Sequence, residues 1–297
     1  MPVITVAILG AGALGHAMAV RLDTQGLSVR VWNRTTSKAA AVADERADIT
    51  VAGGVTEAVR DADVVLTVLR DEAAVAAVAD DLLSGVRPDA VWVQASTIGP
   101  SAAGRLAARA AAAGVAYVDA PVSGSTGPAR AGTLVWLVSG ADDAVARARP
   151  VLDALGGSVH ALGTAGSEGS AAKLVVNAWM ASAVAAASDA LALADSLGVD
   201  HAALREVLGA GALAMPYALA KMEAMDSGAV EPGFAVGLAL KDLRLAGADG
   251  RVPSPVLDAV TRRFDEAVAA GWQGLDVAAL HRLHGAGTST PGDARPS

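Results

Sequence analysis

Lys173 and Asn177 are the side chains whose types and spacing first suggest chemistry. They lie four positions apart in the segment GSAAKLVVN, so on a helix both project from one face. The helix that carries them is otherwise mostly apolar, so a single cation on it requires an explanation. Desolvation favours the neutral amine, which suits a group that protonates a developing alkoxide and acts as a base in the reverse direction. The alternative is a lysine whose charged end extends from a buried helix to solvent.

A glycine-rich loop near the N-terminus is the second candidate. Gly10-Ala11-Gly12-Ala13-Leu14-Gly15 follows a short apolar run and precedes a helical segment. In a GxGxxG loop the first glycine permits a tight turn, the second lets the backbone approach a pyrophosphate, and the third lets helix and strand pack closely. The start of the helix supplies N–H donors and a positive dipole to the phosphates. We therefore expect residues 10–15 to bind a dinucleotide.

The segment Trp32-Asn33-Arg34-Thr35 bears on which dinucleotide is bound. Asn33 stands eighteen residues after Gly15, where an NAD enzyme usually carries an acid for the ribose 2′-hydroxyl, and no acid is present. Arg34 can stack on adenine or bind a 2′-phosphate, while Asn33 and Thr35 can donate hydrogen bonds. The pattern favours NADPH over NADH, and the alternative is a solvated surface arginine.

Two further loops follow expected strands. Gln94-Ala95-Ser96-Thr97 ends the strand expected at 90–94, and DAPVSGSTG (residues 119–127) closes the strand expected at 115–119. Ligands of open α/β sheets gather at the carboxyl ends of strands. The second loop offers hydroxyls and free backbone N–H groups, which suit a carboxylate. Composition alone would favour the alternative, a flexible surface loop.

The elements that must position these residues fall into two parts. Residues 1–164 alternate β-rich runs with Ala-rich helical segments, which predicts a doubly wound parallel sheet, whereas residues 165–285 are dominated by helices. The tail, 286–297, lacks core-forming residues and is expected to be disordered. Strands are expected at 4–9, 29–32, 64–68, 90–94, 115–119 and 133–138, with 156–166 as the exit from the sheet. Helices are expected at 167–197, 201–208, 215–225, 234–248, 254–270 and 277–284.

Composition narrows the function classes. The chain has 297 residues, 53% of them hydrophobic, and a net charge of −8, which argues against a surface devoted to nucleic acid. It contains no cysteine, and its five histidines are scattered, so we expect no metal ion and no zinc-dependent mechanism. The start of the chain resembles a first strand and not a secretory signal, and the long apolar segment at 174–197 carries two aspartates, which favours a buried helix over a membrane span. We expect a cytoplasmic protein.

Taken together, the motifs resemble a known family. The glycine loop followed by AMAVRL, then WNRT, QASTIGP, DAPVSGSTGPARAGTL, GSAAKLVVN and LKDLRLA, occur in the order and spacing of the β-hydroxyacid dehydrogenases. This group includes 3-hydroxyisobutyrate dehydrogenase and NADPH-dependent glyoxylate and succinic semialdehyde reductases. The resemblance runs from Val3 to about Leu280. It implies a 6-phosphogluconate dehydrogenase-like architecture, in which a Rossmann domain is joined by a long helix to an all-helical domain that forms homodimers or homotetramers.

The resemblance also implies roles for individual residues. Lys173 falls at the catalytic lysine, and Thr97 matches the threonine near the nicotinamide ribose. Substrate binding is implied for Ser123, Gly124, Ser125 and Asn177. Cofactor binding is implied for residues 10–15 and for Asn33, Arg34, Thr35, Val68, Leu69, Thr97, Phe234 and Lys241, with Asp242 beside Lys241.

The chain departs from the family pattern at three positions. Gln94 replaces an aspartate, Ser125 replaces a second glycine, and Arg70 replaces a proline. Gln94 is expected to alter the support of a cofactor loop and not the chemistry. Ser125 places a side chain near the acid pocket, which leaves the exact substrate open. The direction of the reaction in the cell is a separate open question.

Other functions fit the motifs less well. Tyr217 and Lys221 imitate the Tyr-x-x-x-Lys pair of short-chain dehydrogenases, but they follow the long helical segment and not the sheet, and no P-loop motif is present. Imine reductases share the architecture and the Asn-Arg-Thr signature, but typically carry Asp or Tyr where this chain has Lys173. A non-catalytic NADPH-binding sensor or scaffold is the alternative of another class, and the retained lysine counts against it.

Overall fold

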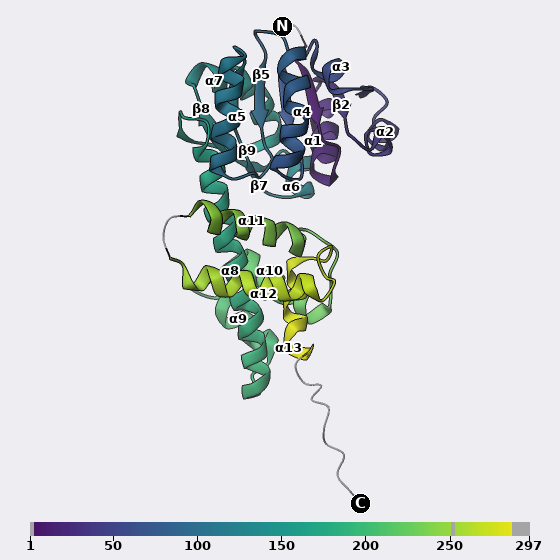
Figure 1. The fold of residues 1–297 in the computed structure, drawn as a ribbon. Coiled ribbons are helices and arrows are strands. Elements are labelled where there is room, and N and C mark those ends of the chain that lie inside the picture. The colour runs from purple at the N-terminus through teal and green to yellow at the C-terminus, as the bar shows by residue number, and fades with distance from the viewer. Residues whose placement is uncertain (1–2, 251–252, 287–297) are drawn as a thin grey trace, which may run out of the picture. The chain divides into compact units, whose positions relative to one another are not determined.

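A computed structural model describes residues 3–250 and 253–286 of the chain (Figure 1). The chain divides into two compact units, one up to Leu174 and one from Val175 onward. The division falls inside a single long helix, α8 (Glu168–Leu197). The expectation of a disordered tail concerns residues 286–297, of which 287–297 lie outside the described residues.

The first unit is built on one sheet of nine strands among its described residues, in the order β3-β2-β1-β4-β5-β6-β8-β7, with β9 also paired to β8. The pairs from β3 across to β6 are all parallel, as the strand–helix alternation predicts. The strands are β1 (Thr5–Leu9), β2 (Ser28–Trp32), β3 (Thr50–Val51), β4 (Val64–Thr67), β5 (Val91–Gln94), β6 (Ala116–Asp119), β7 (Val122–Ser123), β8 (Leu134–Gly140) and β9 (Gly156–Gly163).

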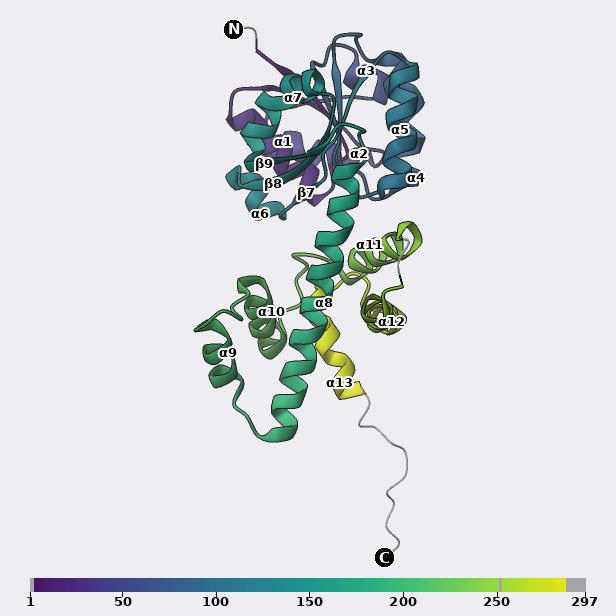
Figure 2. The same cartoon turned by 90° about the vertical axis from the view of Figure 1, so that its left-hand side faces the viewer.

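Helices cover both faces of this sheet. Because side chains alternate along a strand, Val6 and Ile8 of β1 pack into one core with α1, α2, α6 and α7, while Ala7 and Leu9 pack into the other with α3, α4 and α5. Figure 2 shows α1, α6 and α7 on one side of the sheet and α3, α4 and α5 on the other. The helices are α1 (Ala13–Thr24), α2 (Thr36–Glu45), α3 (Val55–Val59), α4 (Glu72–Gly85), α5 (Pro100–Ala112), α6 (Thr126–Ala131) and α7 (Asp142–Leu155).

The far edge of the sheet corrects the expectation from sequence. β8 pairs antiparallel with both β6 and β7. For β7 the reason is that only residues 124–133 join it to β8, and this connection is too short for a crossover to a parallel neighbour. Residues 156–163 form strand β9, parallel to β8, where only an exit from the domain was predicted. This edge strand is mostly half-buried or exposed and begins with two glycines, so it lacks the apolar run by which buried strands are identified.

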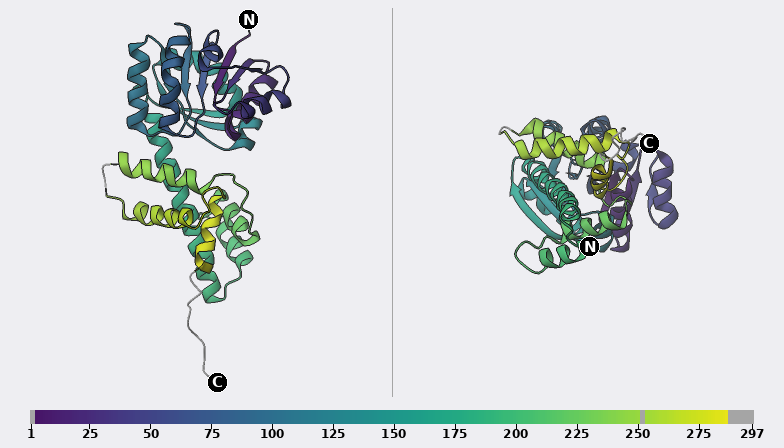
Figure 3. Two further views of the ribbon diagram at one scale, coloured as in Figure 1. Left: turned by 45° about the vertical axis from the view of Figure 1, so that its right-hand side comes forward. Right: turned by 90° about the horizontal axis from the view of Figure 1, so that it is seen from below.

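The regular elements among the described residues of the second unit are all helices, joined by loops, with one isolated β-bridge between Ala235 and Asp276. It contains most of α8 with α9 (His201–Gly209), α10 (Pro216–Ser227), α11 (Val236–Asp249), α12 (Pro255–Ala269) and α13 (Leu283–Ala286). Figure 3 shows α11 lying along α12, and both contribute to a core around Leu240 and Phe264. The helix predicted at 277–284 is mostly a 3₁₀ helix (Val277–Arg282), which begins where the Asp276 carboxylate accepts a hydrogen bond from the Ala278 N–H.

Helix α8 is long and apolar enough, by length and composition alone, to cross a membrane. One side of it packs in the core of the helical unit, where Val184 and Leu191 are fully buried. It also carries Asp189 and Asp195, whose side chains are exposed. This is the pattern of a core helix in a helical domain.

Candidate active site

The glycine loop between β1 and α1 has little space except at its middle glycine. Gly10 has a φ of +120°, and a Cβ there would lie 2.2 Å from the carbonyl oxygen of Val68. A Cβ on Gly15 would lie 1.9 Å from the Gly10 carbonyl oxygen, so the helix packs directly on the loop. Gly12 begins α1 with open space above it and no side-chain cap, so the first N–H groups of the helix are accessible to an anion.

Asn33 ties the glycine loop to the turn after β2. Its Oδ1 accepts a hydrogen bond from the Ala11 N–H at 3.1 Å, and its Nδ2 donates to the Thr35 carbonyl at 3.0 Å. These bonds leave one N–H of the amide for a ligand, so Asn33 is chiefly a brace for the loop. Arg34 and Thr35 are exposed beside it. The sequence-predicted cofactor residues of β1 and β2 therefore form one local cluster.

A buried polar network connects the loops after β4 and β5. Gln94 is fully buried; its Oε1 accepts from the Ser96 N–H at 2.8 Å, and its Nε2 donates to the Ser96 carbonyl at 2.8 Å. Ser96 Oγ in turn accepts from the Leu69 N–H at 2.8 Å. An aspartate at position 94 could accept the first bond but could not donate the second. Gln94 thus links the loops that follow β4 and β5, which carry Leu69 and Ser96.

The loop after β6 has a backbone that requires glycine at one position. Ser123 lies in β7, and Gly124, with a φ of +131°, would place a Cβ 2.7 Å from the Leu134 side chain. Ser125 is the N-terminal cap residue of α6 in ordinary extended conformation, half-buried, with its hydroxyl making no capping bond. Because β5 and β6 are neighbours, the loops that follow them lie at the same edge of the sheet.

Lys173 lies in the first unit, on the second turn of α8, and is half-buried. Asn177 follows four residues later, on the same face of the helix, and is buried. Within the helical unit the Asn177 Nδ2 donates to Asp242 Oδ2 at 2.5 Å, and the Lys241 ammonium lies 2.7 Å from Asp242 Oδ1. Because a carboxylate only accepts, Asp242 fixes which end of the Asn177 amide faces it and leaves the amide oxygen for another partner.

A second buried carboxylate organises the loop that carries Phe234. Asp276 accepts hydrogen bonds from the N–H groups of Gly233 and Phe234, at 2.9 and 3.1 Å, and forms an ion pair with Lys221 at 2.7 Å. The ammonium of Lys221 also lies 5.4 Å from the centre of the Tyr217 ring. Lys221 is therefore engaged in a structural ion pair, as expected if the Tyr-x-x-x-Lys spacing is a coincidence.

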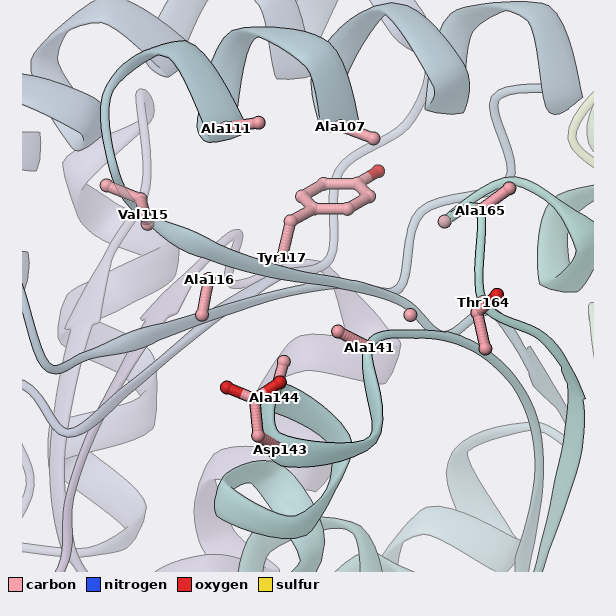
Figure 4. A pocket seen from close by; sticks show the side chains of 12 residues that line it. Ala107, Ala111, Val115, Ala116, Tyr117, Ala141, Asp143, Ala144, Thr164 and Ala165 are labelled. Atoms are coloured by element: carbon pink, nitrogen blue, oxygen red, sulfur yellow. The ribbon is translucent and has the colours of Figure 1, made fainter.

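A cavity of about 280 Å³ in the first unit contains none of the sequence-predicted site residues. Figure 4 shows the Tyr117 ring reaching between α5 and the loop at Ala165, with alanines forming most of the surroundings. Burial raises the pKa of Tyr117 well above its ordinary value of 10, so its hydroxyl stays neutral. Apart from Tyr117, Asp143 and Thr164, the lining residues are small and mostly apolar, and we do not assign the reaction to this cavity.

Asp119, at the start of the loop after β6, is a buried carboxylate to which the sequence alone assigns no role of its own. It ends β6, is fully buried, and binds the first turn of α8 through Ser170. Burial raises its pKa to about 6, while the hydrogen bonds from Ser170 oppose that rise. A signal was available, because an acid that closes an otherwise apolar strand must find buried donors.

The raised pKa of Asp119 predicts how stability changes with pH. A carboxyl whose pKa is about 6 in the native state, against an ordinary 3.8, stabilises the native state fully below about pH 4 and loses that contribution as the pH rises through 6. The free energy of unfolding should fall by about 3 kcal/mol between pH 4 and pH 7 for this reason. Urea unfolding of Asp119→Asn, which cannot ionise, should show a correspondingly flatter profile between pH 4 and 7. If the free energy of unfolding changes equally with pH in the two proteins, the pKa of Asp119 is not raised in the native state.

Two family models together match almost the whole described chain. The NAD binding domain of 6-phosphogluconate dehydrogenase matches residues 5–163, and the NAD-binding domain of NADP-dependent 3-hydroxyisobutyrate dehydrogenase matches residues 167–284. The chain belongs to the 3-hydroxyisobutyrate dehydrogenase family. It is therefore a member of a family of oxidoreductases that bind NAD(P), as the motifs imply.

Curated members of the 3-hydroxyisobutyrate dehydrogenase family align with nearly the full chain. The chain is 32% identical over 288 residues to 2-(hydroxymethyl)glutarate dehydrogenase of Eubacterium barkeri, covering 94% of each protein. It is 31% identical over 281 residues to glyoxylate/succinic semialdehyde reductase 1 of Arabidopsis thaliana, covering 93% of this chain and 96% of that protein.

Solved structures give the same picture. The 3-hydroxyisobutyrate dehydrogenase of Mycobacterium tuberculosis, solved with L-serine, is 30% identical with a TM-score of 0.85, covering 95% of this chain and 99% of that one. A reductive aminase of Aspergillus terreus, in complex with NADPH4, cyclohexanone and allyl amine, is 27% identical with a TM-score of 0.63 and the same coverage. The dehydrogenase has the higher TM-score.

Proposed function

We propose that this protein is an NADPH-dependent oxidoreductase acting on a CH–OH group. It transfers a hydride between the nicotinamide and a small β-hydroxy acid or the corresponding semialdehyde or keto acid. The observation that carries the proposal is Lys173 on α8, one turn before Asn177, in a chain that aligns with hydroxyacid dehydrogenases over more than nine-tenths of its length. The names of the relatives support the substrate class.

The residues around the glycine loop fit a bound dinucleotide. The uncapped start of α1 and the open space at Gly12 suit a pyrophosphate, with residues 10–15 supplying N–H donors. Arg34 is assigned to the 2′-phosphate, with Asn33 bracing the loop and Thr35 beside it. The remaining contacts are assigned to Val68, Leu69, Thr97, Phe234 and Lys241. The cofactor supplies the hydride; the protein supplies its orientation.

The substrate is assigned to the loop after β6 and to α8. Ser123, Gly124 and Ser125 offer hydroxyls and N–H groups for the carboxylate, and the Asn177 amide oxygen, which does not bond Asp242, can accept from the substrate hydroxyl. Lys173 holds the proton that is delivered to the carbonyl oxygen during reduction and takes it back during oxidation. NADPH use favours the direction of reduction.

A substrate panel separates the three functions that this fold could serve. Oxidation of NADPH, followed at 340 nm, is measured with glyoxylate, succinic semialdehyde, methylmalonate semialdehyde and a cyclic imine. Turnover of one or more of the first three is the expected result. Turnover of the imine alone would indicate an imine reductase, and tight NADPH binding without any turnover would indicate a sensor or scaffold.

We also propose that the protein is a cytoplasmic homodimer or homotetramer assembled through its helical unit. The support is an exposed apolar stripe on one side of α8, formed by Val175, Trp179, Leu193 and Leu197, with Trp179 63% exposed. Sedimentation equilibrium of the wild type should give at least twice the chain mass. A monomer at micromolar concentration would overturn the proposed assembly.

A further inference from the structure

A buried carboxylate holds the first turn of α8 against the sheet. Asp119 Oδ2 accepts a hydrogen bond from the Ser170 N–H at 2.7 Å, and Asp119 Oδ1 accepts one from the Ser170 hydroxyl at 2.7 Å. The Ser139 hydroxyl lies 3.4 Å from the same Oδ2. Both carboxylate oxygens are thus used to bind one residue of the helix, and negative charge at a helix N-terminus is favourable.

The backbone of α8 also touches the sheet directly at this point. A Cβ on Gly169 would lie 2.3 Å from the Leu137 carbonyl oxygen and 2.9 Å from the Asp119 carbonyl oxygen. The Gly169 N–H donates to the Ser139 hydroxyl at 3.1 Å. Asp119 and Ser139 are themselves paired across β6 and β8. The helix is therefore seated on two neighbouring strands, with glycine where contact is closest.

The contact of Gly169 and Ser170 with the sheet lies one turn before Lys173. Ser170 precedes Lys173 by three residues, so the two side chains leave the helix on the same side. A rotation or shift of the first turn of α8 is transmitted to the Lys173 amine, because the helix is continuous through this region. Displacement of a reacting group by about 1 Å can lower a rate about 100-fold.

We propose that Asp119 is a positioning residue for Lys173: it sets the rotation and height of α8 on the sheet and so aims the amine. The inference rests on the proposed function. A purely structural role would lower stability but leave kcat of the folded enzyme unchanged. A positioning role lowers kcat with little change in KM or in the Kd for NADPH, since Ser123, Gly124 and Ser125, which are assigned to the substrate carboxylate, and the glycine loop are not replaced.

Three variants of the full-length protein test this. Asp119→Ala removes the anchor, Asp119→Asn keeps an acceptor for the Ser170 N–H, and Ser170→Ala removes one of the two bonds while leaving the carboxylate in place. Ser188→Ala is the matched control, because Ser188 is also buried on α8 but lies 18 residues beyond Ser170. Steady-state kinetics are combined with hydrogen exchange of the amides at 169–173, which reports on the anchor without needing turnover.

The expected result is graded. Asp119→Ala should lower kcat about 10- to 100-fold and speed hydrogen exchange of the amides at 169–173. Ser170→Ala should lower kcat about 3- to 10-fold. Asp119→Asn should keep most of the wild-type kcat. Ser188→Ala should match the wild type. If hydrogen exchange at 169–173 is unchanged in both Asp119→Ala and Ser170→Ala, Asp119 does not hold the first turn of α8. If kcat is unchanged in both folded variants, Asp119 does not position Lys173. A wild type that reduces no substrate would instead refute the proposed function.

Discussion

Replacement of Lys173 with methionine is expected to lower kcat by about 100- to 10,000-fold, the range that a positioned general acid or base contributes. Methionine has a similar length and suits a half-buried position on an otherwise apolar helix, so the variant should fold. Because the glycine loop is untouched, the Kd for NADPH should stay within about threefold of the wild-type value. The loss should thus appear in the chemical step, measured as kcat with the best substrate of the panel.

Lys38→Met is the control for this substitution. Lys38 lies exposed on α2, in the same unit, and its replacement should leave kcat unchanged. A Lys173→Met enzyme that keeps more than about a third of the wild-type kcat would show that another group moves the proton. The substrate would then have to be protonated by water or by a residue of the helical unit.

The second large effect concerns the cofactor. Arg34→Ala should raise the Kd for NADPH about 10- to 100-fold, which corresponds to the 1.5 to 3 kcal/mol that a charge-assisted hydrogen bond contributes. The Kd for NADH should change less than about threefold, because NADH has no 2′-phosphate. Both constants can be read from the fluorescence of the reduced nicotinamide during titration.

Arg60→Ala provides the matched control, since Arg60 is another exposed arginine of the same unit, at the end of α3. It should leave the Kd for both cofactors unchanged. If wild-type protein binds NADH and NADPH equally well, the preference inferred from Arg34 is wrong. The family assignment would be unaffected, because it does not depend on which of the two cofactors is used.

Local sequence patterns were sufficient for much of the fold. The buried parallel strands β1, β4, β5 and β6 are apolar runs bounded by loops, so their existence and near-boundaries could be predicted. The failures lie at the sheet edge: β3 and β7 are two residues long, and β9 is half-exposed. Such strands are stabilised by pairing with a neighbour, and pairing partners are distant in the chain.

The candidate site divides in the same way. The glycine loop, with Arg34 beside it, and the Lys173–Asn177 spacing are local, because a turn, a strand end and a helix face each involve only a few consecutive residues. Asp119 could be seen to end a strand, but its partner Ser170 is 51 residues away. Likewise, Asp242 holds Asn177 from 65 residues away.

The amino-acid sequence by itself determined the alternation of strands and helices, the conformation of the glycine loop and which residue types could carry out proton transfer and bind a phosphate. Only the tertiary structure decided how those groups are held. Asp119 binds the first turn of α8, and the nitrogen of the Asn177 amide donates to Asp242. Lys221 forms an ion pair with Asp276. The physical reason is that buried polar groups must be paired, and the pairing partner is chosen by packing across the fold and not by neighbours in the chain.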